Sequence, residues 1–242
     1  MQYAHRDAFA FEKWLKSASG GHVPKENIKV LLNDGATLAQ FGAALDWLLE
    51  ICKTDDQAII YFSGHGDVET RTRFQPGFLL CWDAPPKVYT AGGAYGLFYL
   101  QDLISTLSID RSVRVIVISD ACHSGKLAGS NIGGPQATAQ SLSQQYANEI
   151  KILSCQPDEV SIEGVSWGGG RGVFSYHLVE GLTGLADSNL DRNVSLSELD
   201  RYLEKWVIEE TQPHRQTPVI VGNRQSIVAL VNDSSLVALR KT

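Results

Sequence analysis

The 242-residue sequence lacks the features that mark several common classes of protein. Its four cysteines are separated by 29, 41 and 33 positions, so no close-spaced pair indicates a structural zinc site, a dithiol redox site or a disulfide framework. No stretch approaches the ~20 apolar residues of a membrane span, and the amino-terminal segment has no apolar signal region. We therefore expect a protein of a reducing compartment, the cytoplasm, with no membrane partner.

Positive charge is also scarce. Lysine and arginine number 21 against 27 aspartates and glutamates, for a net charge of −6, so the overall field repels phosphate backbones and we expect no nucleic-acid partner. Hydrophobic residues make up 43% of the chain and charged residues only 20%, which is enough apolar surface for a sizeable core. We expect a single domain spanning residues 1–242; the oligomeric state is left open.

Apolar runs rich in β-branched residues alternate with segments of helical periodicity. This alternation predicts an α/β fold with a mostly parallel central sheet flanked by helices. The expected strands are 27–32, 58–62, 78–82, 113–119 and 150–155, and the expected helices are 3–19, 37–52, 97–107, 173–185 and 195–210.

Two of the expected strands run into residues that carry chemistry. His65 follows the strand at 58–62, and Cys122, 57 positions later, follows the strand at 113–119. Because the carboxyl ends of parallel strands meet at one edge of a sheet, a Cys-His dyad is geometrically available there. An imidazole within reach is the usual means of activating a thiol nucleophile. Gly66 has no Cβ, so its amide can approach a reacting carbonyl and, with the amide of Cys122, form an oxyanion hole.

The segments around these two residues, YFSGHGD at 61–67 and SDACHSG at 119–125, resemble the active-site motifs of the caspase-like cysteine peptidases, and in particular their metacaspase and bacterial branch. Several other stretches resemble that family in the same order, over most of the chain. The resemblance implies a three-layer caspase-like sandwich, with His65 as general base and Cys122 as nucleophile. The resemblance also implies an apolar strand at the start of the domain, and this sequence has none. Either the chain is truncated or that strand is supplied differently, and we expect the first strand to be missing and a sheet edge to be exposed.

The resemblance also bears on specificity. Caspases carry glutamine two residues before the nucleophile, whereas this chain has Asp120 there, and an acid in the primary pocket selects a basic side chain. The resemblance adds Asp34 and Ser63 as further substrate-binding residues. For Asp34 an alternative stays open, namely that it caps the helix that begins near Thr37.

Together these features predict a cysteine endopeptidase that cleaves protein or peptide substrates after Arg or Lys, with no cofactor and no metal in its chemistry. The alternative is a catalytically weak or inactive caspase-like scaffold or binding module. The stretch from Leu127 to Ile150 contains only Glu149 among charged residues. An enzyme selective for basic residues cannot cut itself inside it. We therefore expect the protein to work as an unbroken chain across this stretch, or to be cut only at Lys126 or Lys151 at its edges, with the loop arginines at 71, 73 and 171 as alternative self-cleavage points.

Two further segments have sequences similar to known ligand-binding loops. Residues 187–198 place Asp187, Asn189, Asp191, Asn193, Ser195 and Glu198 at positions 1, 3, 5, 7, 9 and 12 of an EF-hand-like loop, but Arg192 stands where glycine makes the turn. A polar helix connection, capped by Ser195 or Ser197, explains the same residues, so calcium is left open. The glycine-rich GGGRG at 168–172 lacks the residues of a phosphate-binding loop and is expected to be a flexible substrate-side loop.

Overall fold

The computed structural model describes residues 1–122, 148–156 and 158–239. Within these ranges the chain divides into two compact units, one built from residues 1–30, 161–218 and 223–242, the other from 31–160 and 219–222. The helices are α1 (Ala4–Lys16), α2 (Leu38–Ile51), α3 (Leu97–Ser105), α5 (Val173–Glu180), α6 (Leu196–Thr211) and α7 (Asp233–Leu239). The strands are β1 (Gln57–Ser63), β2 (His65–Val68), β3 (Gly77–Leu80), β4 (Ala94–Gly96), β5 (Arg114–Asp120), β6 (Glu149–Leu153), β7 (Glu163–Gly164), β8 (Arg171–Gly172), β9 (Asn193–Ser195), β10 (Val219–Val221) and β11 (Ile227–Leu230).

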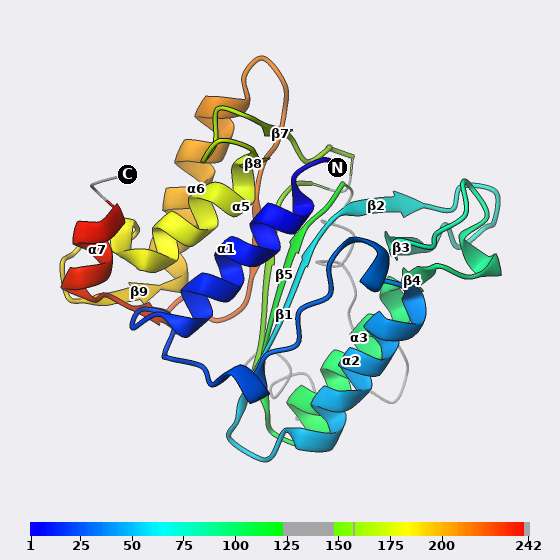
Figure 1. Cartoon of the computed structure of the whole chain (residues 1–242), viewed down its shortest axis with the longest axis horizontal. Helices are drawn as coiled ribbons and strands as arrows, with labels where there is room; N and C mark the ends of the chain where they lie inside the picture. Colours follow the sequence, from blue (N-terminus) through cyan, green and yellow to red (C-terminus); the bar gives the residue numbers. More distant parts are fainter. Residues whose placement is uncertain (123–147, 157, 240–242) are drawn as a thin grey trace. The chain divides into compact units, whose positions relative to one another are not determined.

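The unit that contains residues 31–160 is built on a four-stranded sheet of order β1-β5-β6-β10 (Figure 1). β1, β5 and β6 are parallel and β10 is antiparallel to β6, so the mostly parallel sheet predicted from the sequence is confirmed. Alternate residues of β1 and β5, among them Ile60 and Val117, share one core with Leu100 and Ile104 of α3 and Leu45 of α2. The strand period of two thus places one apolar row of the sheet beneath these two helices.

A second, antiparallel sheet of order β2-β3-β4 continues directly from β1. His65 is therefore the first residue of a strand, paired with Leu80, and not part of a loop after β1. β3 corresponds to the strand expected at 78–82. β2 and β4 are not predicted from the sequence, because strands this short, with glycine at Gly66 and Gly96, have no alternating pattern of their own.

One predicted strand is wrong. Residues 28–32 form no β-ladder, and short 3₁₀ turns, Lys25–Asn27 and Asn33–Gly35, flank them. Ile28 and Leu32 are extended, as their side chains favour, but the stretch between the two 3₁₀ turns belongs to none of the β-ladders of the described residues. Within the described residues β1 pairs only with β5 and stands at an edge of its sheet.

The other unit packs α5 and α6 together, beside the hairpin β7-β8 and the antiparallel pair β9-β11. Asp7 of α1 is fully buried and accepts bonds from Arg171 Nε at 2.9 Å and the amide of Gly172 at 3.1 Å. The expected flexible loop at 168–172 is instead part of the compact β7-β8 hairpin. Glycine is required at Gly170, where φ is +128° and a Cβ would lie 2.6 Å from the guanidinium of Arg6.

In the described part of the chain, no helix has both the length and the apolar character needed to cross a membrane.

Candidate active site

The parallel pairing of β1 with β5 aligns the two motifs found in the sequence. The ladder ends with Ser63 opposite Asp120, and the amide of Gly64 donates to the carbonyl of Asp120 at 3.0 Å. His65 and Cys122 each lie two residues beyond this last pair. They therefore emerge from the same edge of the sheet, where the His65 side chain is exposed and that of Cys122 is half-buried.

Gly66 packs its main chain against the residue that carries the thiol. A Cβ at Gly66 would lie 2.3 Å from the carbonyl oxygen of Cys122 and 3.4 Å from the Cβ of Ala121. A Cβ atom essentially never lies within 3.0 Å of a non-bonded heavy atom, so only glycine allows this approach. Strand β2 is held in place by β3, since Gly66 pairs with Leu79.

Ser154, which the sequence analysis did not single out, fixes the backbone immediately before Cys122. Its hydroxyl accepts from the amide of Ala121 and donates to the carbonyl of Ala121, both at 3.2 Å, and its own amide donates to the carbonyl of Ser119 at 2.9 Å. The thiol of Cys155 donates to the same Ala121 carbonyl at 3.4 Å. Both side chains are fully buried. A serine directly after a buried strand of the parallel sheet is the signal that could have identified this contact.

The three predicted specificity residues occupy different environments. Asp120 is fully buried and its ladder partner Ser63 is half-buried; residues opposite each other in a ladder project from the same face of the sheet. Asp34 is exposed, in the turn Asn33–Gly35. That turn is tied to the segment after β3, because the amide of Trp82 donates to the carbonyl of Ala36 at 2.9 Å.

The capping alternative for Asp34 is wrong. The Thr37 hydroxyl accepts from the amide of Gln40, and the carboxylate of Asp83 accepts from the amide of Leu38 at 2.8 Å. The amino terminus of α2 is thus capped by Thr37 and Asp83, which leaves the substrate-binding interpretation of Asp34 as a prediction.

The environments of the other three cysteines disfavour the thiolate. Burial raises the pKa of Cys81 to about 11, with Asp83 adding to the effect, and burial also raises the pKa of Cys52. The thiol of Cys155 is fully buried and donates to the Ala121 and Glu159 carbonyls. A thiol is nucleophilic only as the thiolate, so these three sites are poor nucleophiles.

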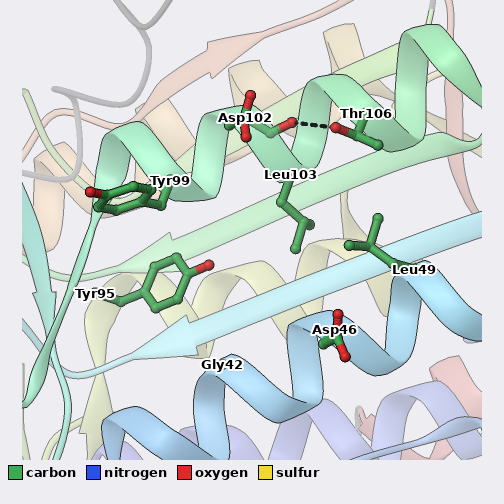
Figure 2. Close-up of a pocket in the computed structure, with 8 residues that line it drawn as sticks. All are labelled: Gly42, Asp46, Leu49, Tyr95, Tyr99, Asp102, Leu103 and Thr106. Atoms are coloured by element: carbon green, nitrogen blue, oxygen red, sulfur yellow. Dashed lines mark hydrogen bonds between the residues drawn. The ribbon is translucent and has the colours of Figure 1, made fainter.

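A separate hollow of about 290 Å³ lies between α2 and α3 (Figure 2). Its lining includes Tyr95 and one carboxylate from each helix, Asp46 and Asp102, and contains neither His65 nor Cys122. Burial and the charge of Asp102 raise the pKa of Tyr95, which therefore stays a neutral phenol. Among the described residues, no three acidic, histidine or cysteine side chains gather around one point that a metal ion could occupy.

Comparison with known proteins agrees with this architecture. The sequence model of one protein family, the caspase domain, matches residues 1–226. The chain belongs to the caspase-domain family. Caspase domains are cysteine peptidases that act on proteins or peptides, and this family has the α/β fold expected from the sequence motifs.

Solved structures share the fold of this caspase domain. A protein of Geobacter sulfurreducens superposes with a TM-score of 0.56 at 19% identity, covering 93% of this chain and 89% of its own. Caspase-1 of Spodoptera frugiperda superposes with a TM-score of 0.57 at 16% identity, covering 91% of this chain and 78% of its own. No curated protein matches the sequence.

Proposed function

We propose that this caspase domain is a metacaspase-like cysteine endopeptidase that uses Cys122 and His65 to cleave peptide bonds after arginine or lysine. The observation that carries the proposal is the register of β1 and β5, which sets His65 and Cys122 two residues beyond the paired Ser63 and Asp120. The close approach of Gly66 to Cys122 supports it.

In the proposed reaction the sulfur of Cys122, having given its proton to His65, attacks the scissile carbonyl carbon. The amides of Gly66 and Cys122 donate to the oxygen that becomes negatively charged. His65 then passes the proton to the leaving amine as the carbon–nitrogen bond breaks, and a thioester remains on Cys122. Water, deprotonated by His65, hydrolyses the thioester, releasing the acid and restoring the thiol. No step requires a cofactor.

Specificity for a basic side chain rests on Asp120. Its carboxylate has no exposed surface, and a charge-assisted bond to a guanidinium or ammonium is strongest where water is excluded. Ser63, on the same face, and the exposed Asp34 complete the proposed pocket. An acidic substrate side chain would meet like charge there, at a cost of several kcal/mol.

The test compares fluorogenic peptides that end in Arg, Lys or Asp, using the wild-type protein and the variants Cys122→Ala, His65→Ala and Asp120→Asn. We expect turnover of the Arg and Lys peptides only, loss of activity in the first two variants, and losses that do not add in the double variant. Asp120→Asn should lower turnover of Arg peptides while a small thiol reagent still labels Cys122.

The site assignment is tested separately by an Arg-containing peptide electrophile and mass mapping of the adduct. An adduct on Cys52, Cys81 or Cys155 would overturn it, and a preference for Asp peptides would overturn the specificity. A wild-type protein that neither turns over a peptide nor takes the label would favour an inactive scaffold.

The proposal also covers the domain organisation and the cellular location of the protein. A single domain is supported by one family match that runs through parts of both compact units. A cytoplasmic location is supported by the four cysteines, none of which forms a disulfide, as is usual in a reducing compartment.

A further inference from the structure

The segment 187–198 follows α5 and ends in the first turn of α6. Within it, side-chain oxygens accept hydrogen bonds from main-chain amides that lie further along the chain. Asp187 Oδ2 accepts from the amide of Arg192 at 3.0 Å. Asn189 Oδ1 accepts from the amide of Asp191, and Asp191 Oδ1 from the amide of Asn193, both at 2.8 Å. The loop therefore coils around these side-chain oxygens.

Arg192 makes the sharp turn that glycine makes in an EF-hand loop. Its φ is +67°, so the left-handed conformation that favours glycine is present at this position despite the side chain. The guanidinium is directed to Asp233, with an N–O distance of 3.0 Å. Directly after the turn, Val194 is fully buried in β9, which pairs with β11. The departure from the EF-hand pattern thus changes a side chain and leaves the backbone turn intact.

One oxygen in this loop has no hydrogen-bond partner. Asp187 is only 9% exposed, and its Oδ1 is buried and unpartnered in the described structure. The bond from Arg192 to Oδ2 fixes the same carboxylate on the inner side of the loop. An unpaired buried carboxylate oxygen is costly in the absence of a cation or donor. This orphaned oxygen occupies position 1, the first ligand position of an EF-hand loop.

We propose that residues 187–198 bind a calcium ion, with Asp187 as the first ligand and Asn189 and Asp191 as further oxygen donors. Carboxylate, amide and main-chain oxygens are the donors that Ca²⁺ takes, in a flexible sphere of six to eight. Among the described residues, no three acidic, histidine or cysteine side chains gather around one point. The proposed ligands need no such cluster, because the side-chain amide of Asn189 and main-chain carbonyls supply part of the oxygen donors.

Glu198, at position 12, accepts bonds from the amide and hydroxyl of Ser188 and of Ser195, and with Ser195 it forms the capping box of α6. The capping role expected for Ser195 is therefore confirmed. Burial opposes ionisation of Glu198, but the bonds from Ser195 and Ser188 outweigh it and lower the pKa of this carboxyl group.

The test measures calcium binding by calorimetry on the full chain after removal of metal with a chelator, and needs no peptidase activity. We expect a dissociation constant of about 10⁻⁴ M, a rise in melting temperature with millimolar calcium, and a smaller rise with magnesium, which demands a tighter octahedral site. Asp187→Asn should weaken binding at least tenfold. If that buried substitution prevents folding, the exposed Asp191→Asn serves in its place.

The matched control is Asp200→Asn, which removes a carboxylate of α6 that pairs with Arg224 outside the loop; it should bind calcium like the wild type. The proposal is overturned if the wild-type protein shows neither binding heat nor a melting shift with calcium. Unchanged affinity in Asp187→Asn or in Asp191→Asn would equally overturn it, as would an equal shift with magnesium.

Discussion

Replacing Gly66 by alanine tests the contact on which the proposed oxyanion hole depends. The added Cβ would stand 2.3 Å from the carbonyl oxygen of Cys122, whereas ordinary contacts begin near 3.4 Å. Neither neighbour is the flexible end of a side chain, because one is backbone and the other is Cβ of Ala121. Strand β2 must therefore move away from Cys122 by about 1 Å, and a displacement of that size at a reacting centre can lower the rate about 10²-fold. This corresponds to about 2.7 kcal/mol of transition-state stabilisation.

Gly64→Ala is the matched control, because it alters the glycine on the other side of His65. Its Cβ would meet only the ring of Phe62, at 2.9 Å, and an aromatic ring can shift where a backbone carbonyl cannot. The assay is kcat/KM on an Arg peptide, with melting temperature and thiol labelling of Cys122 measured in parallel. We expect Gly64→Ala to stay within a few-fold of the wild type. Activity of Gly66→Ala within a few-fold of the wild type, or equal losses in both variants, would refute the reasoning.

Three further predictions concern positioning, stability and processing. Ser154→Ala should lower kcat more than it changes KM, because it removes the hydrogen bonds that hold the backbone before Cys122. The control is Ser119→Ala, which removes a buried hydroxyl without a hydrogen-bond partner in the described structure and should leave both constants unchanged. Equal effects of the two variants in steady-state kinetics would contradict this prediction. Asp7→Ala should lower the free energy of unfolding, measured by chemical denaturation, by about 3–5 kcal/mol, since it removes the buried carboxylate that pairs with Arg171. Glu12→Ala, which breaks the exposed pair with Lys16, should cost under about 0.5 kcal/mol. In intact-mass spectrometry of active protein we expect no quantitative break between residues 127 and 150. Any self-cleavage should fall at Lys126 or at the exposed Arg71 or Arg73. A break between residues 127 and 150 that is absent in Cys122→Ala would contradict the proposed specificity.

The structure narrows the self-cleavage sites that the sequence left open. Lys151 lies in the middle of β6, is 3% exposed and donates to the side chain of Gln101 at 2.7 Å. Arg171 is held by Asp7. A peptidase needs its substrate extended and accessible, so neither residue can be cut in the folded chain. Lys126 lies outside the described residues.

The sequence by itself determined the long elements and the two motifs. Strands such as Gln57–Ser63 and Arg114–Asp120, and helices such as α2 and α6, carry enough periodic residues for local patterns to specify them. The same patterns place His65 and Cys122 after two expected strands, and parallel strands finish at one edge of a sheet; the structure decided that these two strands are neighbours.

The tertiary structure alone decided which extended segments pair and which side chains meet across the chain. Residues 28–32 have the composition of a strand yet form no ladder, while His65–Val68 pairs with β3 despite a weak pattern. Ser154 reaches Ala121 across 33 positions, and Asp83 caps a helix 45 positions earlier. Hydrogen-bond partners so distant in sequence leave no periodic signal, because they depend on how β-strands and turns are brought together in folding.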